Sequence, residues 1–414
     1  MKNKNLWTTL SLVNLCIVAL LGTTLRTKFL FSIPFIDYKN FLSAHSHFAF
    51  GGWVTLALMI LYVDNLLLED QKEKKAYQWI LWGIEITSLG MAISFPFRGY
   101  AFFSILFSSA FIFFTYGFSW IFIRDLRKAK RERPVMLFSV AALLFLVISS
   151  VGPFTLAYIM ASGAGDAFLY RDAIYTYLHL QYNGFFTFSI FALFTNSIIT
   201  ANDATTVKRI YRFAAVLTLS VLPSLFLSLL FHSFNLYAEG IAVVGCLLLV
   251  VALILFFRFA FDLNLSFFQS VPLARTLIVF SLVSFGIKML LQVGTIVPSL
   301  HNAVFGFRPI IIGFLHLVFL GFVTFYILSQ FLATGLFQAE QKFSSRAIIF
   351  FASAIILNET ILLVDGIGLM FYSTNPIYPW LLWAAAILLF CGAASILTAR
   401  LKSRVSVTRS KRME

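Results

Sequence analysis

Three histidines in this chain carry the same local pattern, in which an aromatic residue follows three positions later and a glycine follows five positions later. Neutral imidazole is the commonest protein ligand for heme iron and for copper. Within an apolar segment an imidazole costs free energy unless it has such a partner, so the pattern indicates metal chemistry. The copies are His47 with Phe50 and Gly52, His179 with Tyr182 and Gly184, and His316 with Phe319 and Gly321.

The spacing of the copies predicts a body of three related parts, because the gaps between successive histidines are nearly equal, at about a third of the chain each. A heme with two axial histidines needs imidazoles from facing helices at one depth. On each helix the glycine would leave a flat surface beside the histidine, and the aromatic residue would share its face, so a planar macrocycle would fit there. The alternative is purely structural, since the chain has 50 phenylalanines and glycine is common where membrane helices touch.

The elements that must position these histidines are membrane spans. Hydrophobic residues make up 60% of the chain and charged residues 12%, and the mean hydropathy is +0.91, which excludes a soluble globular protein. A span needs roughly 20 apolar residues. The sequence therefore predicts an all-α polytopic membrane protein with twelve transmembrane helices in one domain, residues 1–414. The runs cover approximately 7–30, 41–67, 77–97, 100–123, 135–160, 173–201, 210–234, 237–261, 272–297, 309–333, 346–370 and 379–399.

The basic residues indicate how these spans are oriented. The net charge of +14 lies largely in short loops between apolar runs, so it does not point to nucleic acid as a partner. Most Lys and Arg residues fall on the side that holds both termini, including a basic tail at 400–414. Both termini are therefore expected in the cytoplasm, with membrane lipid as the surrounding partner.

With this orientation, all three patterned histidines lie near the outer ends of inward-running spans. Each follows a helix-start marker by seven residues, which corresponds to a depth of roughly 10 Å. The markers are Asn40, Asp172 and Pro309. The remaining histidines also fall in the outer half. They are His45, His232 and His301.

The three cysteines give no sign of a metal or disulfide site. Cys16, Cys246 and Cys391 each lie within an apolar run and form no C-x-x-C pair. A covalently attached c-type heme is also not expected, because the sequence lacks C-x-x-C-H. We interpret the cysteines as apolar packing residues.

Twelve spans, both termini inside, a three-part arrangement and histidines on the second, sixth, seventh and tenth spans resemble subunit I of the heme-copper oxidase superfamily. That family includes nitric oxide reductases, and a related heme and copper membrane family takes part in nitric oxide response. The resemblance implies a pseudo-threefold helix bundle in the bacterial inner membrane, electron transfer or handling of O2 or NO, a quinone or cytochrome c as electron donor, and partner subunits.

The resemblance also implies roles for individual residues. A low-spin heme, b-type or similar, would be held by His47 and His316, with His45 as the alternative on the second span. Copper would be held by His179 and His232. Tyr182 lies near the position of a redox-active tyrosine, at the third residue after the histidine instead of the fourth.

The sequence departs from the family pattern at the gas-binding centre. The seventh span has His232 without a second histidine beside it, and the tenth span has Phe314 where a high-spin heme ligand is expected. His45 or His301 could complete a copper site. Alternatively His316 is the high-spin ligand and the low-spin heme is the one lost.

Other polar residues within or beside the spans could serve the same chemistry. Arg308 is placed just above His316, where a guanidinium would suit a heme propionate or a lipid headgroup. Glu85, Lys288 and Glu359 are ionisable groups within spans and could mark proton paths, although an ion pair between Lys288 and Glu359 would be a purely structural alternative.

Two other functions are compatible with the sequence. Twelve spans with both termini inside is also a common plan for secondary transporters, which usually have two related halves and broken helices. No twofold repeat is visible in this sequence. A non-catalytic heme or copper sensor is the other alternative.

Overall fold

A computed structural model of the chain describes residues 3–163, 166–230, 236–337, 342–373 and 375–410. The described residues form helices and no strand, and twelve helices are long and apolar enough to cross a membrane, which confirms the predicted all-α architecture and the number of spans. These helices indicate a multi-pass membrane protein. The spans are Lys4–Leu30, Tyr38–Leu66, Lys75–Arg98, Phe102–Ala129, Arg133–Ser162, Ala167–Ala201, Ala204–Leu229, Leu236–Ala260, Pro272–Gly294, Arg308–Ala333, Lys342–Met370 and Ile377–Lys402.

Uninterrupted α-helices form seven of these spans, and short helices lie between some of them. The uninterrupted ones are α1 (Lys4–Leu30), α5 (Lys75–Arg98), α6 (Phe102–Ala129), α12 (Leu236–Ala260), α14 (Pro272–Gly294), α18 (Lys342–Met370) and α19 (Ile377–Ser410). The fifth span joins α7 (Arg133–Ser149) to α8 (Val151–Ser162), and the seventh joins α11 (Ala204–Leu225) to the 3-10 turn η4 (Phe226–Leu229). The short helices are α4 (Glu69–Lys72), α13 (Ser266–Gln269) and α15 (Pro298–Gly306).

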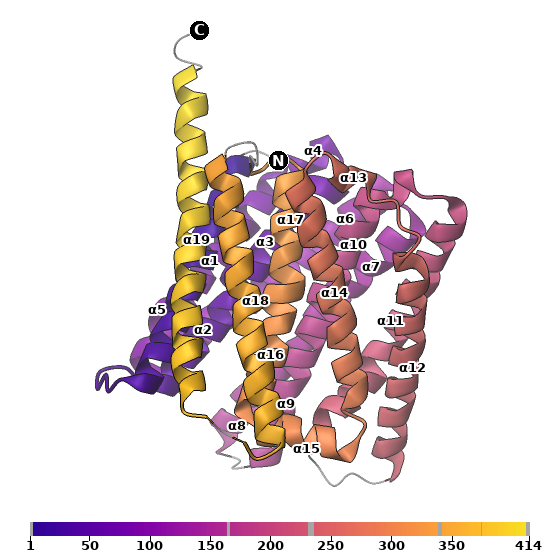
Figure 1. Cartoon of the computed structure of the whole chain (residues 1–414). Coiled ribbons are helices and arrows are strands. Elements are labelled where there is room, and N and C mark those ends of the chain that lie inside the picture. Colours follow the sequence, from indigo (N-terminus) through magenta and orange to yellow (C-terminus); the bar gives the residue numbers. More distant parts are fainter. Residues whose placement is uncertain (1–2, 164–165, 231–235, 338–341, 374, 411–414) are drawn as a thin grey trace.

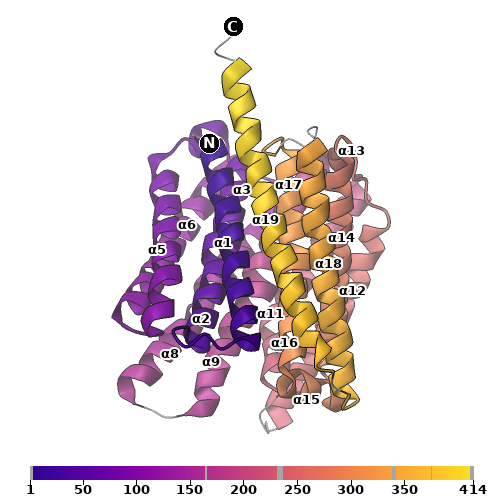
Figure 2. The ribbon, with the colours of Figure 1, turned by 60° about the vertical axis from the view of Figure 1, so that its left-hand side comes forward.

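The two ends of the bundle carry different features. Helix α1 begins and α19 ends at the same end, and these two helices pack side by side (Figures 1 and 2). Helices α2 (Tyr38–Phe48), α9 (Ala167–His179) and α16 (Arg308–His316) begin at the opposite end, which we call the histidine end. An even number of spans places both termini on one side, as the sequence predicts. That this side of the membrane is the cytoplasm stays a prediction.

The three spans that carry the patterned histidines are each interrupted by a π-helical segment directly after the histidine. In each case the α-helix ends at the histidine or at the next residue, and the aromatic residue and glycine of the pattern lie within the π segment. The wider i to i+5 hydrogen bonding is rare and is often found at functional sites. The segments are η1 (Ala49–Thr55), η2 (Leu180–Phe186) and η5 (Leu317–Thr324), and they are followed by α3 (Leu56–Leu66), α10 (Thr187–Ile198) with η3 (Ile199–Ala201), and α17 (Phe325–Ala333).

Each π segment has a backbone carbonyl that accepts a hydrogen bond from a side chain. Such a bond is needed because, within a membrane, backbone groups that the helix does not pair internally must find another partner. The bonds run from Asn14 Nδ2 to the Gly52 carbonyl at 2.7 Å, from Thr187 Oγ1 to the Tyr182 carbonyl at 2.6 Å, and from Ser281 Oγ to the Phe322 carbonyl at 2.7 Å.

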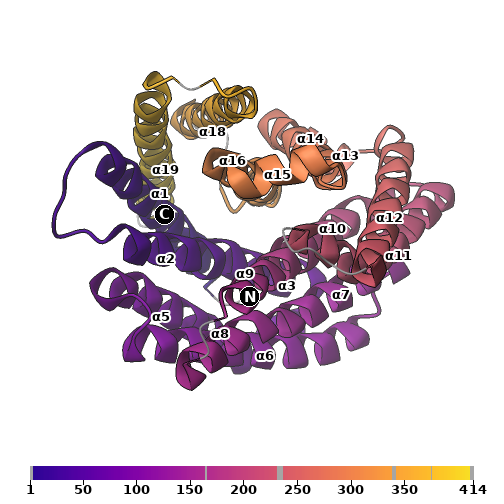
Figure 3. The same ribbon diagram turned by 90° about the horizontal axis from the view of Figure 1, so that it is seen from below.

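The three π segments meet through aromatic side chains. The ring centroids of Phe50 and Phe319 are 4.6 Å apart, and each lies 5.5 Å from the ring of Phe186. Trp53 Nε1 also donates to Thr324 Oγ1 at 3.0 Å. Figure 3 shows α9 near the centre of the bundle, with α5 and α6 along one side and α14 and α18 along the other. The second and sixth spans are the most enclosed, with 83% and 72% of their most apolar stretches buried.

The helix-start markers expected from the sequence need correction in two of three spans. Asp37 caps α2 through the backbone N–H of Asn40, so Asn40 lies inside the helix. Asp166 caps α9 by accepting from the N–H groups of Phe168 and Leu169, which places Asp172 inside that helix. The three histidines therefore do not follow their helix starts by one common distance. Their shared feature is the π segment.

For α16 the expected marker is confirmed. Pro309 lies in its first turn, where a missing N–H is tolerated.

Candidate functional site

His45 and His316 lie on the two sides of the candidate site. His45 Nδ1 is 3.1 Å from the Val18 carbonyl oxygen of α1. A carbonyl can only accept, so Nδ1 carries the proton and Nε2 keeps its lone pair. His316 lies close enough to His45 to interact with it electrostatically, and His316 Nδ1 is buried without a hydrogen-bond partner. Two imidazoles from different spans thus lie within electrostatic range of each other, with ligating capacity left over.

The helices that carry these two histidines do not pack closely on each other. Helix α2 packs on α1 and α5, whereas α16 packs on α18, α15 and η5. Helices in direct contact are about 8–10 Å apart. No residue from 309 to 317 is either fully buried or fully exposed, so this half of the tenth span is partly covered on all sides. That environment differs from α17 in the same span, where eight of nine residues are buried.

Gly22 of α1 makes room for the imidazole of His45. A Cβ atom at Gly22 would lie 3.1 Å from His45 Cε1, which is closer than side chains normally approach. The glycine and the Val18 carbonyl, one helical turn apart, together fix the ring against α1. A histidine whose Nδ1 is held in this way has its ring orientation and tautomer set for binding through Nε2.

Two arginines approach this site from the histidine end. Arg26 of α1 interacts electrostatically with His45, His316, Arg308 and Asp365. Both guanidiniums are thus available to a carboxylate-bearing ligand near the histidines.

Arg308 is held against Tyr38 at the start of α2. Its Nη2 donates to the Tyr38 hydroxyl at 2.8 Å, and its guanidinium lies 4.8 Å from the centre of that ring. This contact links the beginning of the tenth span to the beginning of the second. Arg308 therefore lies at the histidine end, at the start of the span that carries His316, and its role as a partner of a heme propionate stays a prediction.

His47 faces a different neighbour from His45. Its Nδ1 donates to the Ser43 carbonyl at 2.9 Å, and its ring packs on Phe95 of α5 with centroids 4.5 Å apart. The Tyr100 hydroxyl is 3.5 Å from His47 Nε2. Burial raises the pKa of Tyr100 to about 12, so this hydroxyl keeps its proton at physiological pH. Of the two histidines on the second span, His45 is the one that interacts electrostatically with His316.

His179 is fully buried and hydrogen-bonded through both ring nitrogens. Its Nε2 donates to the Val221 carbonyl of α11 at 2.8 Å. Its Nδ1 lies 3.0 Å from Asn183 Nδ2 and 3.1 Å from Ser228 Oγ, and it accepts there. These bonds satisfy a neutral imidazole within the protein, so neither nitrogen is open to a metal in this arrangement.

The other residues expected at a copper centre are placed as follows. Tyr182 is buried, with its ring 6.1 Å from that of His179 and 5.6 Å from that of Phe314. His301 lies on α15 at the histidine end, and His232 lies outside the described residues. In the described part of the chain, no group of three or more His, Cys, Asp or Glu side chains is arranged to hold a metal ion. Copper stays a prediction.

The glycines of the pattern do not provide the flat surface for a macrocycle that the sequence suggested. A Cβ at Gly184 would lie 2.5 Å from Phe145 Cβ on α7, and one at Gly321 would lie 2.8 Å from Ser284 Oγ on α14. At Gly52 it would meet the ring of Phe48 in the same span, at 2.6 Å. These glycines serve close packing around the π segments, which is the structural alternative.

The ion pair between Lys288 and Glu359, given above as the structural alternative, is not formed. Lys288 Nζ donates instead to Asn183 Oδ1, and Glu359 accepts from its neighbour Asn358 at 2.9 Å. Glu85 is buried and accepts from Asn14 Nδ2 at 2.7 Å. Both Lys288 and Glu85 are thus tied to π segments, because Asn183 lies in η2 and Asn14 also binds η1.

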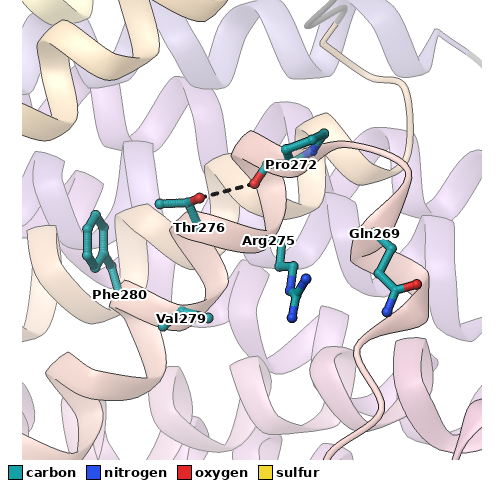
Figure 4. Close-up of a pocket in the computed structure, with 6 residues that line it drawn as sticks. All are labelled: Gln269, Pro272, Arg275, Thr276, Val279 and Phe280. Atoms are coloured by element: carbon teal, nitrogen blue, oxygen red, sulfur yellow. Dashed lines mark hydrogen bonds between the residues drawn. The ribbon is translucent and has the colours of Figure 1, made fainter.

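A surface pocket at the start of α14 lies apart from the histidines, near the end of the bundle that holds the termini. Figure 4 shows its lining, in which Thr276 Oγ1 donates to the Pro272 carbonyl at 3.1 Å. Arg275 is its only ionisable side chain, and Val279 and Phe280 are exposed where lipid would lie. Its other polar side chains are Gln269 and Thr276, and none of the patterned histidines lines it.

Sequence reasoning missed the contribution of α1 to the candidate site. Val18, Gly22 and Arg26 recur at four-residue spacing and so lie on one helix face. That periodicity is visible in the sequence, but only the structure directs this face at His45. Comparison of the chain with models of known protein families and with curated proteins finds no match.

Proposed function

We propose that this chain is an integral membrane heme protein related to subunit I of the heme-copper oxidases, with His45 and His316 as the axial ligands of one low-spin heme, b-type or similar. The observation that carries the proposal is the pair of imidazoles from α2 and α16 that approach each other across two helices that do not pack closely. His45 replaces His47 as the favoured ligand of the second span, because its Nδ1 is held by Val18 and its Nε2 is left to bind.

The surrounding residues fit such a group. An imidazole nitrogen that is buried without a partner, as at His316 Nδ1, is rare in a protein interior and leaves that nitrogen open to a bound group. Arg26 interacts electrostatically with both histidines and with Arg308, so two guanidiniums at this end of the bundle would suit the two propionates of a heme. Both are on the side from which the propionates emerge in the related family.

The three π segments support the wider kinship. We propose that the spans starting at α2, α9 and α16 are related by a pseudo-threefold axis through the aromatic contact of Phe50, Phe186 and Phe319. Three equivalent interruptions favour this plan over a transporter, whose broken helices come in two matched halves. The resemblance favours the bacterial inner membrane as the location, and the distribution of basic residues favours an orientation with the histidine end outward.

A bound heme would supply one-electron transfer or binding of a diatomic gas such as O2 or NO. The chain itself would hold the iron through two imidazoles, which favours electron transfer over gas binding because no axial position remains open. His179 is satisfied by its own hydrogen bonds, so we do not assign copper to it. The electron donor, a quinone or a cytochrome c, and any partner subunit remain predictions.

The test is the heme content and spectrum of the full-length protein, purified from cells supplied with heme. We expect a low-spin spectrum in the wild type and its loss in both His45→Gly and His316→Gly. External imidazole should restore the low-spin bands in these two variants, because it can occupy the space of the removed side chain. His47→Gly is the matched control on the same helix and should keep its heme.

Two outcomes would contradict the proposal at different levels. A wild type without heme absorption would overturn the function. Loss of heme in His47→Gly together with full heme in His45→Gly would overturn the ligand assignment and return it to the histidine first favoured by the sequence. Metal analysis of the same samples decides whether copper is present, with His179→Ala as the informative variant.

A further inference from the structure

Lys288 is a buried cation without a counter-charge in the described structure. It lies in α14 with 1% of its surface exposed, and its Nζ donates to Asn183 Oδ1. Its other neighbours are the rings of Tyr182 and Phe285, with centroids 5.9 Å and 5.6 Å from Nζ, and Met289 Sδ at 3.9 Å. No carboxylate of the described residues lies within ion-pair distance. An ammonium has three donors, and only one is strongly bonded here.

Gln292 lies one helical turn further along α14 and has no partner for either atom of its amide. Only 4% of its surface is exposed, and both Nε2 and Oε1 are buried without a hydrogen bond. Residues four apart lie on one helix face, so Gln292 lies on the same face of α14 as Lys288. Buried amides are almost always satisfied, and two orphaned atoms on one side chain therefore point to a missing partner.

These two side chains end a polar stripe on the inner face of α14. Ser281 donates to the Phe322 carbonyl, and Ser284 lies against Gly321, so both serines of the stripe contact η5. Lys288 and Gln292 lie further along α14, toward the histidine end. Lys288 bonds to Asn183, and the amide of Gln292 has no hydrogen-bond partner. The serines of the stripe thus form a helix contact, whereas Lys288 and Gln292 have donors and acceptors without a protein partner.

We propose that Lys288 and Gln292 form a binding site for a small monovalent oxyanion that retains one O–H group, of which bicarbonate is the simplest. Lys288 would supply the charge and donors, and Gln292 Nε2 would donate to a second oxygen. Gln292 Oε1 would accept from the O–H group, a role that a fully deprotonated anion cannot fill. The aromatic rings beside Nζ make its surroundings apolar, which strengthens the attraction for an anion. This site does not depend on the proposed heme function.

The test is thermal unfolding of the purified full-length protein in detergent, in chloride-free buffer titrated with potassium bicarbonate. Potassium nitrate tests an oxyanion without an O–H group, and potassium gluconate controls for ionic strength. We expect saturable stabilisation by bicarbonate, with nitrate at least tenfold weaker. Lys288→Met and Gln292→Leu should each weaken bicarbonate binding at least tenfold. Gln330→Leu, the same change at a buried glutamine near the opposite end of the bundle, should leave it within twofold.

Gln292→Glu keeps the proposal testable if the first two variants fold poorly. It places a carboxylate beside Lys288, so it should remove the response to bicarbonate while unfolding at or above the wild-type temperature. Bicarbonate binding that is unchanged in Gln292→Glu would overturn the proposal. Absence of any saturable response to bicarbonate in the wild type would also overturn it, and would leave water as the partner of the Gln292 amide. Equal affinity for nitrate and bicarbonate would overturn the role of Gln292 Oε1 and with it the ligand class.

Discussion

The hydrogen bonds of Asn14 allow a quantitative test of how the first π segment is stabilised. Asn14 and Glu85 are 0% and 3% exposed, and Asn14 Nδ2 donates to both Glu85 Oε2 and the Gly52 carbonyl at 2.7 Å. Asn14→Leu would leave two buried acceptors without their donor. At about 1–3 kcal/mol for each unsatisfied group, the loss is about 2–6 kcal/mol. Asn14 Oδ1 is itself unpartnered, and its removal shifts the expected value toward the lower end.

Glu85→Leu should be milder than Asn14→Leu. It removes one acceptor and leaves the bond from Asn14 to Gly52 in place, so about 1–3 kcal/mol is expected. In the double variant only the Gly52 carbonyl lacks its donor, and the total should fall short of the sum of the single changes. The predicted coupling energy is about 2–6 kcal/mol, because each substitution made alone leaves the hydrogen-bonding group of the other side chain unsatisfied.

The assay is reversible unfolding in mixed micelles by SDS titration, which reports the four free energies of the cycle. Asn358 and Glu359 provide a matched control, because the same two residue types are hydrogen-bonded to each other on α18 without contacting a π segment. Asn358→Leu should cost less than Asn14→Leu, since Glu359 is only partly buried. Strict additivity of the Asn14 and Glu85 substitutions would refute the reasoning, because the two side chains would then not share the hydrogen bond.

Three further predictions concern other parts of the bundle. Gly22→Val should lower the heme content of the purified protein, measured as pyridine hemochrome, because the added side chain would displace the imidazole packed against it. Ser281→Ala should lower the stability measured by SDS titration by about 1–3 kcal/mol, because the Phe322 carbonyl loses its donor. Hydrogen bonds from Thr206 lower the pKa of Asp203, the cap of α11, so its contribution should be present above the ordinary pKa of an aspartate and disappear as the pH falls through the lowered value. The gap in thermal midpoint between wild type and Asp203→Ala should accordingly narrow from pH 6 to pH 3.

The number and type of the spans could be predicted from the sequence because both depend on composition alone. Runs of apolar residues of sufficient length fix the helices without reference to neighbours. The starts of α2 and α9 were predicted several residues too late, because Asn40 and Asp172 were taken as caps where Asp37 and Asp166 serve. Several residues near each helix start can act as a cap, and the sequence does not distinguish the one that does.

The candidate site was only partly predictable, because its geometry depends on which face each helix turns inward. The sequence identified His316 and Arg308 and named His45 as the alternative to His47. It did not indicate that His45 turns toward α1 and His47 toward α5, since two positions apart on a helix give nearly opposite faces. The hydrogen-bond partner of Lys288 could not be predicted from the sequence either, because Asn183 is distant in sequence and carries no charge.

The repeated histidine pattern is better explained by helix geometry than by ligand chemistry. A π segment turns the residues that follow it by up to about one position, or roughly 100°, relative to an α-helix. In the second span the histidine and the aromatic residue of the pattern accordingly have different neighbours, whereas in the sixth span the rings of His179 and Tyr182 stay 6.1 Å apart. His47 packs on α5 while Phe50 turns to the ring of Phe319. Glycine within such a segment permits close packing of the wider turn against a neighbour, as at Gly321 and Ser284. The pattern therefore marks where three spans change helix type, and only one of its three histidines, the one on α16, also lies at the candidate heme site.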